Sequence, residues 1–377
     1  MAVLTAWADA SPVAAQAGGV ISGDRAWAVA FLGLLVLAFL LYLVGLLLLR
    51  RGPAGVAWVV AVGLAVQLAP LAGPLLLSAD VWTYWGYAQL DNPYEQTPAE
   101  VRDPDSYPWV GERWRDTTSV YGPAFTLAVE PTSAIESATA VAWLFRAVAA
   151  AAICACVLAA ARAGPLAAGF VGWNPVVAIH AAGGGHNDAW IGALVVGAIV
   201  LGAVGRRQAA GVAWVVGAFV KWIPLVLLPL RVLEARTTRR AVGHAGFAGA
   251  TVVVVALATW QYGLSWIEAF GPLARNASDT TSFALPSRLT QIGIPKAVAL
   301  ALAAVAFAVA YAWLARQAWR GRARVALAAG VLLLCAPYVT PWYLAWVVPL
   351  AALEDDRTAR LLALGLTAYL LPQTIPV

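Results

Sequence analysis

Charged residues are scarce in this sequence of 377 residues. They make up 11% of the chain, whereas hydrophobic residues make up 62%. Soluble domains average about 25% charged and about 45–50% apolar residues. The composition therefore excludes an ordinary soluble domain and indicates a membrane protein. A bundle of about ten membrane spans would use the whole length, because each span needs about 20 residues.

Cysteine and the common catalytic motifs are also rare or missing. The three cysteines, Cys154, Cys156 and Cys335, lie in apolar stretches without metal-site or redox spacing. The sequence has no glycine loop of the nucleotide-binding type and no nucleophilic serine motif. It shows no internal repeat of fixed period. These absences argue against a nucleotide-dependent enzyme and against a cysteine-based metal site.

The arginines give the topology. The net charge of +5 would suit an acidic partner. However, Lys and Arg concentrate in short loops, where they set the orientation of membrane spans, and we expect no nucleic acid partner. Arg50 and Arg51 follow the first apolar run, so we predict them to be cytoplasmic. The segment that begins at Ser78, after the second run, is then predicted to lie outside.

The apolar runs predict an all-α, polytopic transmembrane helical bundle, which we interpret as one domain over residues 1–377. The predicted spans are residues 26–49, 54–77, 138–161, 165–182, 189–204, 241–260, 296–315, 326–337 and 344–353, and a last short span that ends near Leu371.

Two long polar segments lie on the predicted outer side, residues 78–121 and residues 261–295. Loops of this length are usually functional or disordered. Tryptophan and tyrosine recur through the first segment, which argues against disorder, so we expect short helices on the outer membrane surface. In the second segment, Arg275 and Arg288 are candidates for anion contacts, although solvated loop charge explains them equally well.

Residues 208–230 look like one span, but arginines at both ends assign both ends to the cytoplasm. The flanking arginines are Arg206, Arg207, Arg231, Arg236, Arg239 and Arg240. Lys221 and Pro224 lie near the middle, so we predict two short half-helices whose tip points outward. At that tip Lys221 would meet a phosphate as a point charge, or it would extend its ammonium to the membrane surface.

Asp80 is the candidate general base. It lies just past the outer end of an apolar run, and it shares a face with Tyr84 if the segment is helical. We expect partial desolvation to raise the pKa of its carboxyl group towards the range of a useful base. The alternative is that Asp80 only caps an interfacial helix.

A glycine run, residues 183–185, precedes His186, Asn187 and Asp188 on the predicted outer side. Glycines let the backbone approach a ligand or adopt a positive φ. The three polar residues begin the next helix, where the helix dipole favours an anion. A glycine turn with an Asn/Asp cap is the simpler interpretation. His186 and Asp188 alone are too few ligands for a metal site.

Together these residues predict an outer cavity with one base, several hydrogen-bonding groups and cations for a phosphate. An enzyme that uses a nucleotide-linked donor would keep its site on the cytoplasmic side, so the charged donor must be available outside. A lipid-linked phosphate fits, since its tail can lie between helices while its head reaches the cavity.

Several segments resemble a known superfamily. The run Ser-Ala-Asp-Val-Trp-Thr-Tyr-Trp-Gly-Tyr at residues 78–87, Asn-Pro-Tyr at residues 92–94 and Ser-Val-Tyr-Gly-Pro at residues 119–123 resemble the first outer loop of GT-C superfamily glycosyltransferases. They are most similar to the polyprenol-phosphate-mannose-dependent α-mannosyltransferases of actinobacteria.

Two further segments extend the resemblance. Asn-Pro at residues 174–175 with Gly-Gly-His-Asn-Asp at residues 184–188 is similar to a pattern in the α-1,6-mannosyltransferases of that group. Lys-Trp-Ile-Pro at residues 221–224 resembles a lysine–proline element of the family. The chain is short for these enzymes, which often have more spans.

The resemblance implies a GT-C fold and an inverting transfer of mannose from a polyprenyl-phosphate donor to a lipid-linked or cell-envelope glycan such as lipomannan. It implies a multi-pass protein of the plasma membrane with an extracytoplasmic active site, without a metal or another cofactor. Asp80 would act as the general base, and Lys221 would contact the phosphate. Donor binding would also involve His186, Asn187, Asp188, Arg275 and Arg288. Substrate-shaping residues would be Tyr84, Asn92, Tyr94, Tyr121, Asn174 and Tyr343.

A transporter or flippase for a lipid-linked sugar is the competing hypothesis. A broken helix, as predicted around Lys221, is a transporter feature. Transporters often carry inverted repeats, which this sequence lacks, and they rarely need so long a polar and aromatic loop. A structural scaffold would leave the concentration of polar groups on one side unexplained.

Overall fold

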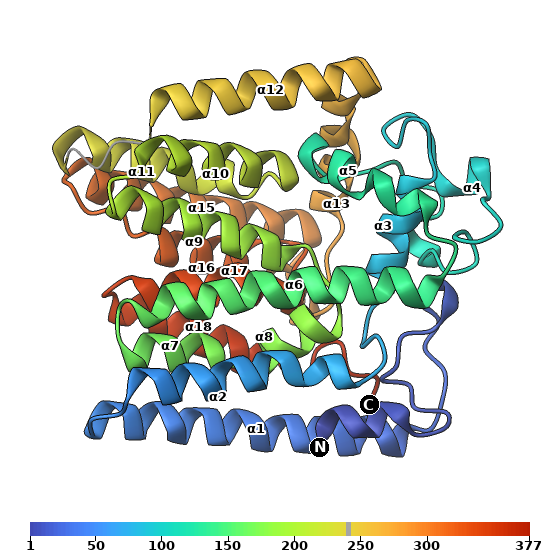
Figure 1. Ribbon diagram of the computed structural model, residues 1–377, viewed down its shortest axis with the longest axis horizontal. Helices are drawn as coiled ribbons and strands as arrows, with labels where there is room; N and C mark the ends of the chain where they lie inside the picture. The colour runs from blue at the N-terminus through green and yellow to red at the C-terminus, as the bar shows by residue number, and fades with distance from the viewer. Residues whose placement is uncertain (239–242) are drawn as a thin grey trace.

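The computed structural model describes residues 1–238 and 243–377, and its regular structure is helical (Figure 1). Within these residues no strand forms, and one isolated bridge joins Ala14 and Leu76. By length and composition, four of the described helices can cross a membrane: α1 (Arg25–Arg51), α6 (Ala138–Ala161), α12 (His244–Tyr262) and α15 (Lys296–Trp319). The predicted all-α polytopic membrane fold is confirmed.

Shorter helices complete the bundle. They are α2 (Val56–Leu68), α7 (Pro165–Gly172), α8 (Pro175–Ala178), α9 (Asp188–Ala203), α10 (Arg207–Val220), α11 (Pro224–Thr238), α16 (Val325–Cys335), α17 (Leu344–Leu353) and α18 (Arg357–Leu370). Short helices outside the long ones are α3 (Asp80–Ala88), α4 (Pro98–Val101), α5 (Pro123–Val129), α13 (Phe270–Ser278) and α14 (Leu285–Gln291). Figure 1 shows α3, α4 and α5 gathered at one end of the bundle, which we call the loop end.

Helices α1 and α12 lie at opposite edges of the bundle in Figure 1 and expose apolar side chains. In their most apolar stretches only 22% of the residues of α1 and 11% of those of α12 are buried. Leu48 is 63% exposed and Trp260 is 88% exposed. Apolar faces this large favour association or aggregation in water, but they match the hydrocarbon of a bilayer.

The sequence predicts a continuous span over residues 165–182, and the structure breaks it. Helix α7 ends at Gly172, and the following pair of α8 and a π-helical turn (Ile179–Gly183) is bent from α7 by 49°. Pro175 disfavours helical geometry at Asn174. The Asn174 side chain accepts hydrogen bonds from the backbone N–H groups of Val176 and Val177, so it begins a new helix.

The predicted break at Lys221 is confirmed. Helix α10 ends at Val220 and α11 begins at Pro224. Ala210 near the start of α10 and Arg231 in α11 line one cavity at the end of the bundle opposite the loops. The two helices therefore form a hairpin whose tip carries Lys221 to the loop end. Arg239 and Arg240, predicted to be cytoplasmic, lie outside the described residues.

Helices α9 and α17 approach each other closely at Gly192. Gly192 of α9 lies against the backbone of Ala345 and Trp346, and a Cβ atom there would clash with the carbonyl oxygen of Ala345. Gly197, on the same helix, has open space around its Cα. This contact places Asp188, at the start of α9, beside the Trp346 side chain.

We predict that Gly192→Ala destabilises the protein by about 1–3 kcal/mol, since it overpacks a helix contact. Gly197→Ala is the matched control and should be neutral or slightly stabilising, because alanine favours the helix. Thermal unfolding in detergent measures both variants. Equal shifts of Tm in the two variants would contradict the proposed close contact.

Candidate active site

A cavity of about 360 Å³ opens at the loop end of the bundle. Of the residues that line it, Asp80 and Lys221 carry charge. Its aromatic wall consists of Trp114, Tyr121, Trp222, Tyr338, Trp342, Tyr343 and Trp346. Its apolar wall consists of Val120, Ile223, Val226, Leu273, Leu332, Leu333, Ala336 and Pro337. The cavity therefore combines one acid, one cation, several aromatic rings and an extended apolar side.

Asp80 is the first residue of α3, and its backbone N–H donates to the Ser78 hydroxyl (3.2 Å). The side chain of Trp82 fixes this helix by donating to the carbonyl oxygen of Ala138 in α6 (2.9 Å). The Asp80 carboxylate is 19% exposed, and its Oδ2 lies 3.3 Å from Nδ1 of His186. The sequence predicts the helical segment and the nearness of His186 to the site, but not this contact.

The structure corrects the expected pKa of Asp80. Burial opposes ionisation of the carboxyl group. The neighbouring His186 and the positive charge of Lys221 outweigh burial, so the pKa of Asp80 lies below its usual range rather than above it. The prediction of a raised pKa was wrong because the sequence does not show which groups face the carboxylate. Asp80 is therefore ionised at neutral pH.

His186 is buried beside Asp80 and stacks on the Trp342 ring, with 3.9 Å between ring centroids. Gly185 allows this placement, because it has a φ of +70° and its Cα faces Val81 and Arg146. The predicted use of a glycine with positive φ is confirmed at this position. His186 does not line the cavity itself, so it reaches the site through Asp80 and Trp342.

Arg146 anchors the segment that carries His186, and the sequence analysis missed it. Its guanidinium group donates to the carbonyl oxygens of Ala182 (2.9 Å) and Pro70 (2.6 Å). Arg146 is 2% exposed in the middle of α6. The first bond satisfies a carbonyl oxygen of the π-helical turn, and the second ties Arg146 to the short helix of residues 69–72. An arginine within the apolar run 138–161 was the signal available in the sequence.

Asp188, which is buried, and Lys221, which is partly buried, form an ion pair. The ammonium group of Lys221 lies 2.9 Å from Oδ1 and 2.8 Å from Oδ2 of Asp188. The indole N–H of Trp346 also donates to the Asp188 carboxylate (3.1 Å), and the ammonium lies 4.8 Å from the centroid of the Tyr343 ring. These contacts orient the Lys221 side chain, which lines the cavity, whereas Asp188 does not line it.

Two of the remaining predicted residues, Tyr121 and Tyr343, line the cavity. Asn187 does not line it and is buried next to His186. Residues outside the cavity wall are Tyr84, Asn92, Tyr94, Asn174, Arg275 and Arg288.

Those outside the wall have structural contacts. Tyr84 packs edge-on against Tyr121, and Asn92 donates to Ser265 (2.8 Å), joining the two long polar segments. The Tyr94 hydroxyl bonds that of Thr126 (2.8 Å). The Arg288 guanidinium donates to the Tyr369 hydroxyl (2.9 Å), and Arg275 lies on the exposed surface of α13.

Several aromatic residues of the wall escaped the sequence analysis. Tyr338, Trp342 and Trp346 follow one another at intervals of four residues, and all three line the cavity. Trp342 and Trp346 lie on consecutive helical segments, where four-residue spacing places side chains on one face, whereas Tyr338 lies in the bend before them. Trp114 ends a single 3-10 turn of residues 112–114 and Trp222 lies in the break between α10 and α11, so spacing gives no sequence signal for either.

In the described part of the chain, no group of three or more His, Cys, Asp or Glu side chains is placed to hold a metal ion. The charged side chains of the cavity wall are those of Asp80 and Lys221. A carboxylate ionised at neutral pH can accept a proton, and an ammonium group can bind an anion.

We predict that Lys221→Met destabilises the protein by about 3 kcal/mol or more, because it leaves the buried Asp188 carboxylate without its partner. The double variant Lys221→Met/Asp188→Asn removes that charge and should recover most of the loss. Thermal unfolding in detergent compares the two. If the single variant is no less stable than the double variant, the ion pair does not hold these segments together.

Comparison with known proteins identifies the family. A family model described as alpha-(1->6)-mannopyranosyltransferase, N-terminal domain, matches residues 3–236, and a model described as MptB C-terminal domain matches residues 285–376. No curated protein and no solved structure matches the chain. The first model covers more than half of the chain and includes Asp80, His186 and Lys221, and the predicted resemblance to the actinobacterial α-1,6-mannosyltransferases is confirmed. The chain belongs to the alpha-(1->6)-mannopyranosyltransferase family and is a membrane mannosyltransferase.

Proposed function

We propose that this mannosyltransferase moves a mannosyl residue from a polyprenyl-phosphate donor to a lipid-linked or cell-envelope glycan at the extracytoplasmic face of the plasma membrane. One observation carries the proposal: Asp80 and Lys221 line the same cavity, and a long apolar wall completes it. A base, a phosphate-binding cation and a path for a lipid tail are the three features that this reaction needs.

The apolar wall suits the lipid part of the donor. Val226 of α11, Leu273 of α13 and Leu332 of α16 come from three different helices and all line the cavity. A polyprenyl chain that enters between these helices keeps its hydrocarbon out of water. Its phosphate then lies near Lys221, and the sugar faces Asp80.

The aromatic wall suits the sugar. Trp114, Tyr338 and Trp342 contribute ring surfaces to the same cavity as the carboxylate. Apolar ring faces shield the reacting centre from water, and this strengthens the electrostatic interactions inside the cavity. A shielded site also favours transfer to a sugar hydroxyl over hydrolysis.

The reaction is proposed as a single displacement. Asp80 accepts the proton of the acceptor hydroxyl while that oxygen attacks the anomeric carbon of mannose. The bond between the anomeric carbon and the phosphate oxygen breaks, and its electron pair leaves with the lipid phosphate. Lys221 stabilises the added negative charge of the phosphate. One displacement inverts the anomeric centre, so a β-linked donor gives an α-mannoside.

Asp188 and His186 are proposed as positioning residues. Asp188 is 1% exposed and holds the Lys221 ammonium from the side away from the cavity. His186 holds Asp80 in its ionised form through the 3.3 Å contact. Neither side chain lines the cavity, so neither needs to touch the substrate.

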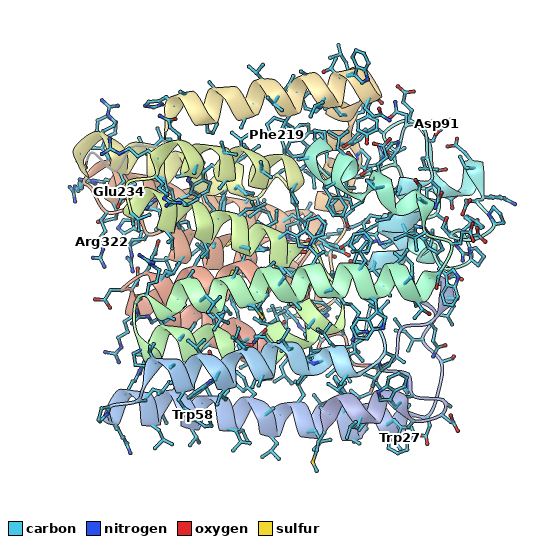
Figure 2. All side chains as sticks on the ribbon, in the orientation of Figure 1. Trp27, Trp58, Asp91, Phe219, Glu234 and Arg322 are labelled. Atoms are coloured by element: carbon cyan, nitrogen blue, oxygen red, sulfur yellow. The ribbon has the colours of Figure 1, made fainter. Side chains whose placement is uncertain are left out.

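We predict that Asp80→Asn lowers mannosyl transfer by about 10²–10⁴-fold, the usual range for loss of a general base. Membranes that contain the protein are supplied with radiolabelled polyprenyl-phosphate mannose, and label in the glycolipid product is counted. Asp91→Asn is the matched control, since Asp91 is an exposed aspartate of the same outer segment (Figure 2). Full activity of Asp80→Asn would remove Asp80 from the mechanism.

The contact between His186 and Asp80 predicts a pH effect. Because this contact lowers the pKa of Asp80, His186→Gln should raise that pKa, and activity should be lost at a higher pH on the acid side. The acid limb of the pH–rate profile should therefore move to higher pH. The pH–rate profile of the transfer reaction measures this shift. His180→Gln is the control, because the His180 ring is also a neighbour of the Trp342 ring. An unchanged acid limb in His186→Gln would exclude this role of the contact.

A further inference from the structure

A second cavity, of about 480 Å³, lies at the end of the bundle opposite the candidate active site. It opens where α6, α9, α10 and α11 end or begin and where the turns at residues 321–324 and 353–356 meet them. Figure 2 shows Glu234 and Arg322, two residues of its wall, at the edge of the molecule far from Asp91. The distribution of arginines predicts that this end faces the cytoplasm.

Most acidic groups of this cavity are already used within the protein. Arg231 pairs with Glu234, and Arg324 pairs with Asp356 through two hydrogen bonds. Glu354 accepts hydrogen bonds from the first backbone N–H groups of α16, at Val325 (2.8 Å) and Ala326 (3.0 Å). Two of the four acids of the wall are therefore paired with arginines of the wall, and Glu354 is held by backbone N–H groups.

Two guanidinium groups remain. Arg162, at the end of α6, and Arg322, in the turn before α16, both line the cavity and are exposed. In the described part of the chain neither side chain has an ion pair or a hydrogen bond to another residue. The remaining acid of the wall, Asp355, is fully exposed and lies 3.6 Å from Arg360. The cavity therefore presents two unpaired cations beside neutralised ion pairs.

The rest of the wall is largely apolar, with several small side chains. Ala159, Ile199, Ala203 and Val204 line the same space, as does the buried Trp214. Small side chains at helix ends leave room for a ligand between the helices. An apolar wall next to unpaired guanidinium groups matches an amphiphile with an anionic head.

We propose that this cavity, marked by Arg162 and Arg322, binds a phosphate-bearing ligand, and that the head group of a membrane phospholipid is its occupant. Guanidinium groups bind phosphate oxygens through paired, charge-assisted hydrogen bonds. Basic cavities between helices at the cytoplasmic head-group level are suited to anionic lipids. A soluble phosphate shares the chemistry of the head group, so the test must separate the two sources. The cavity is distinct from the proposed donor site. If the phosphate proposal is wrong, the proposal of mannosyl transfer is unaffected.

Native mass spectrometry and fluorescence titration of the full chain in detergent test the proposal with three probes. Dioctanoyl phosphatidylglycerol carries both the phosphate and the lipid part. Dioctanoylglycerol carries the lipid part alone, and inorganic phosphate carries the anion alone. The variants are Arg162→Gln/Arg322→Gln and, as matched control, Arg320→Gln, since Arg320 is an exposed arginine of the same end outside the cavity wall. Both arginines of the double variant are unpaired in the described structure, so folding should be retained, and Tm checks it.

We expect phosphatidylglycerol to bind, and the double variant to weaken it by about tenfold or more through lost charge-assisted hydrogen bonds. Arg320→Gln should bind like the unaltered chain, and dioctanoylglycerol should not bind at this site. The outer cavity also contains a cation. The difference in phosphatidylglycerol binding between the double variant and the unaltered chain therefore shows how much of the binding occurs at this site. A third outcome is that inorganic phosphate binds in a way that depends on the two arginines, while the lipid does not bind. This outcome would support the phosphate site but assign it to a soluble ligand. Equal binding of phosphatidylglycerol to the double variant, binding of dioctanoylglycerol as strong as that of phosphatidylglycerol, or no binding of any probe would overturn the proposal.

Discussion

The ion pair between Lys221 and Asp188 is the interaction on which the candidate site depends. Burying two charges is costly, and it is tolerated only with close geometry and additional hydrogen bonds. Both conditions hold, because both carboxylate oxygens meet the ammonium group and Trp346 donates to one of them. The pair ties the break between α10 and α11 to the start of α9 and to α17. It thereby determines where the cation of the cavity lies relative to Asp80.

Much of the fold was predictable from the sequence, because long apolar runs and arginine positions have direct physical meaning in a membrane. The run at residues 138–161 coincides with α6, and the break at Lys221 followed from arginines that flank both ends of one apolar segment. The bend before Asn174 was missed, although Pro175 marks it. The apolar character of residues 165–182 favoured a continuous span, and Pro175 alone did not change that prediction.

The site was predictable in its members but not in its connections. The sequence singled out Asp80, His186, Asp188 and Lys221, and the structure joins Asp80 with His186 and Asp188 with Lys221. Which of them pair is a property of three-dimensional packing. Asp188 faces Lys221 instead of the cavity, and His186 faces Asp80, which reversed the expected direction of the Asp80 pKa shift. The role of Arg146 depends on a π-helical turn that no sequence pattern indicated.

In the proposed donor complex, one cavity holds the donor lipid along α11 and α16 with its phosphate at Lys221. Photo-crosslinking locates this lipid, with a polyprenyl phosphate that carries a diazirine in the isoprene unit next to the phosphate. We expect labelled peptides from residues 224–238 and 325–335, near Val226 and Leu332, and loss of label when excess unlabelled polyprenyl phosphate competes. Label confined to the lipid-facing helices α1 and α12, and unchanged by the competitor, would contradict it.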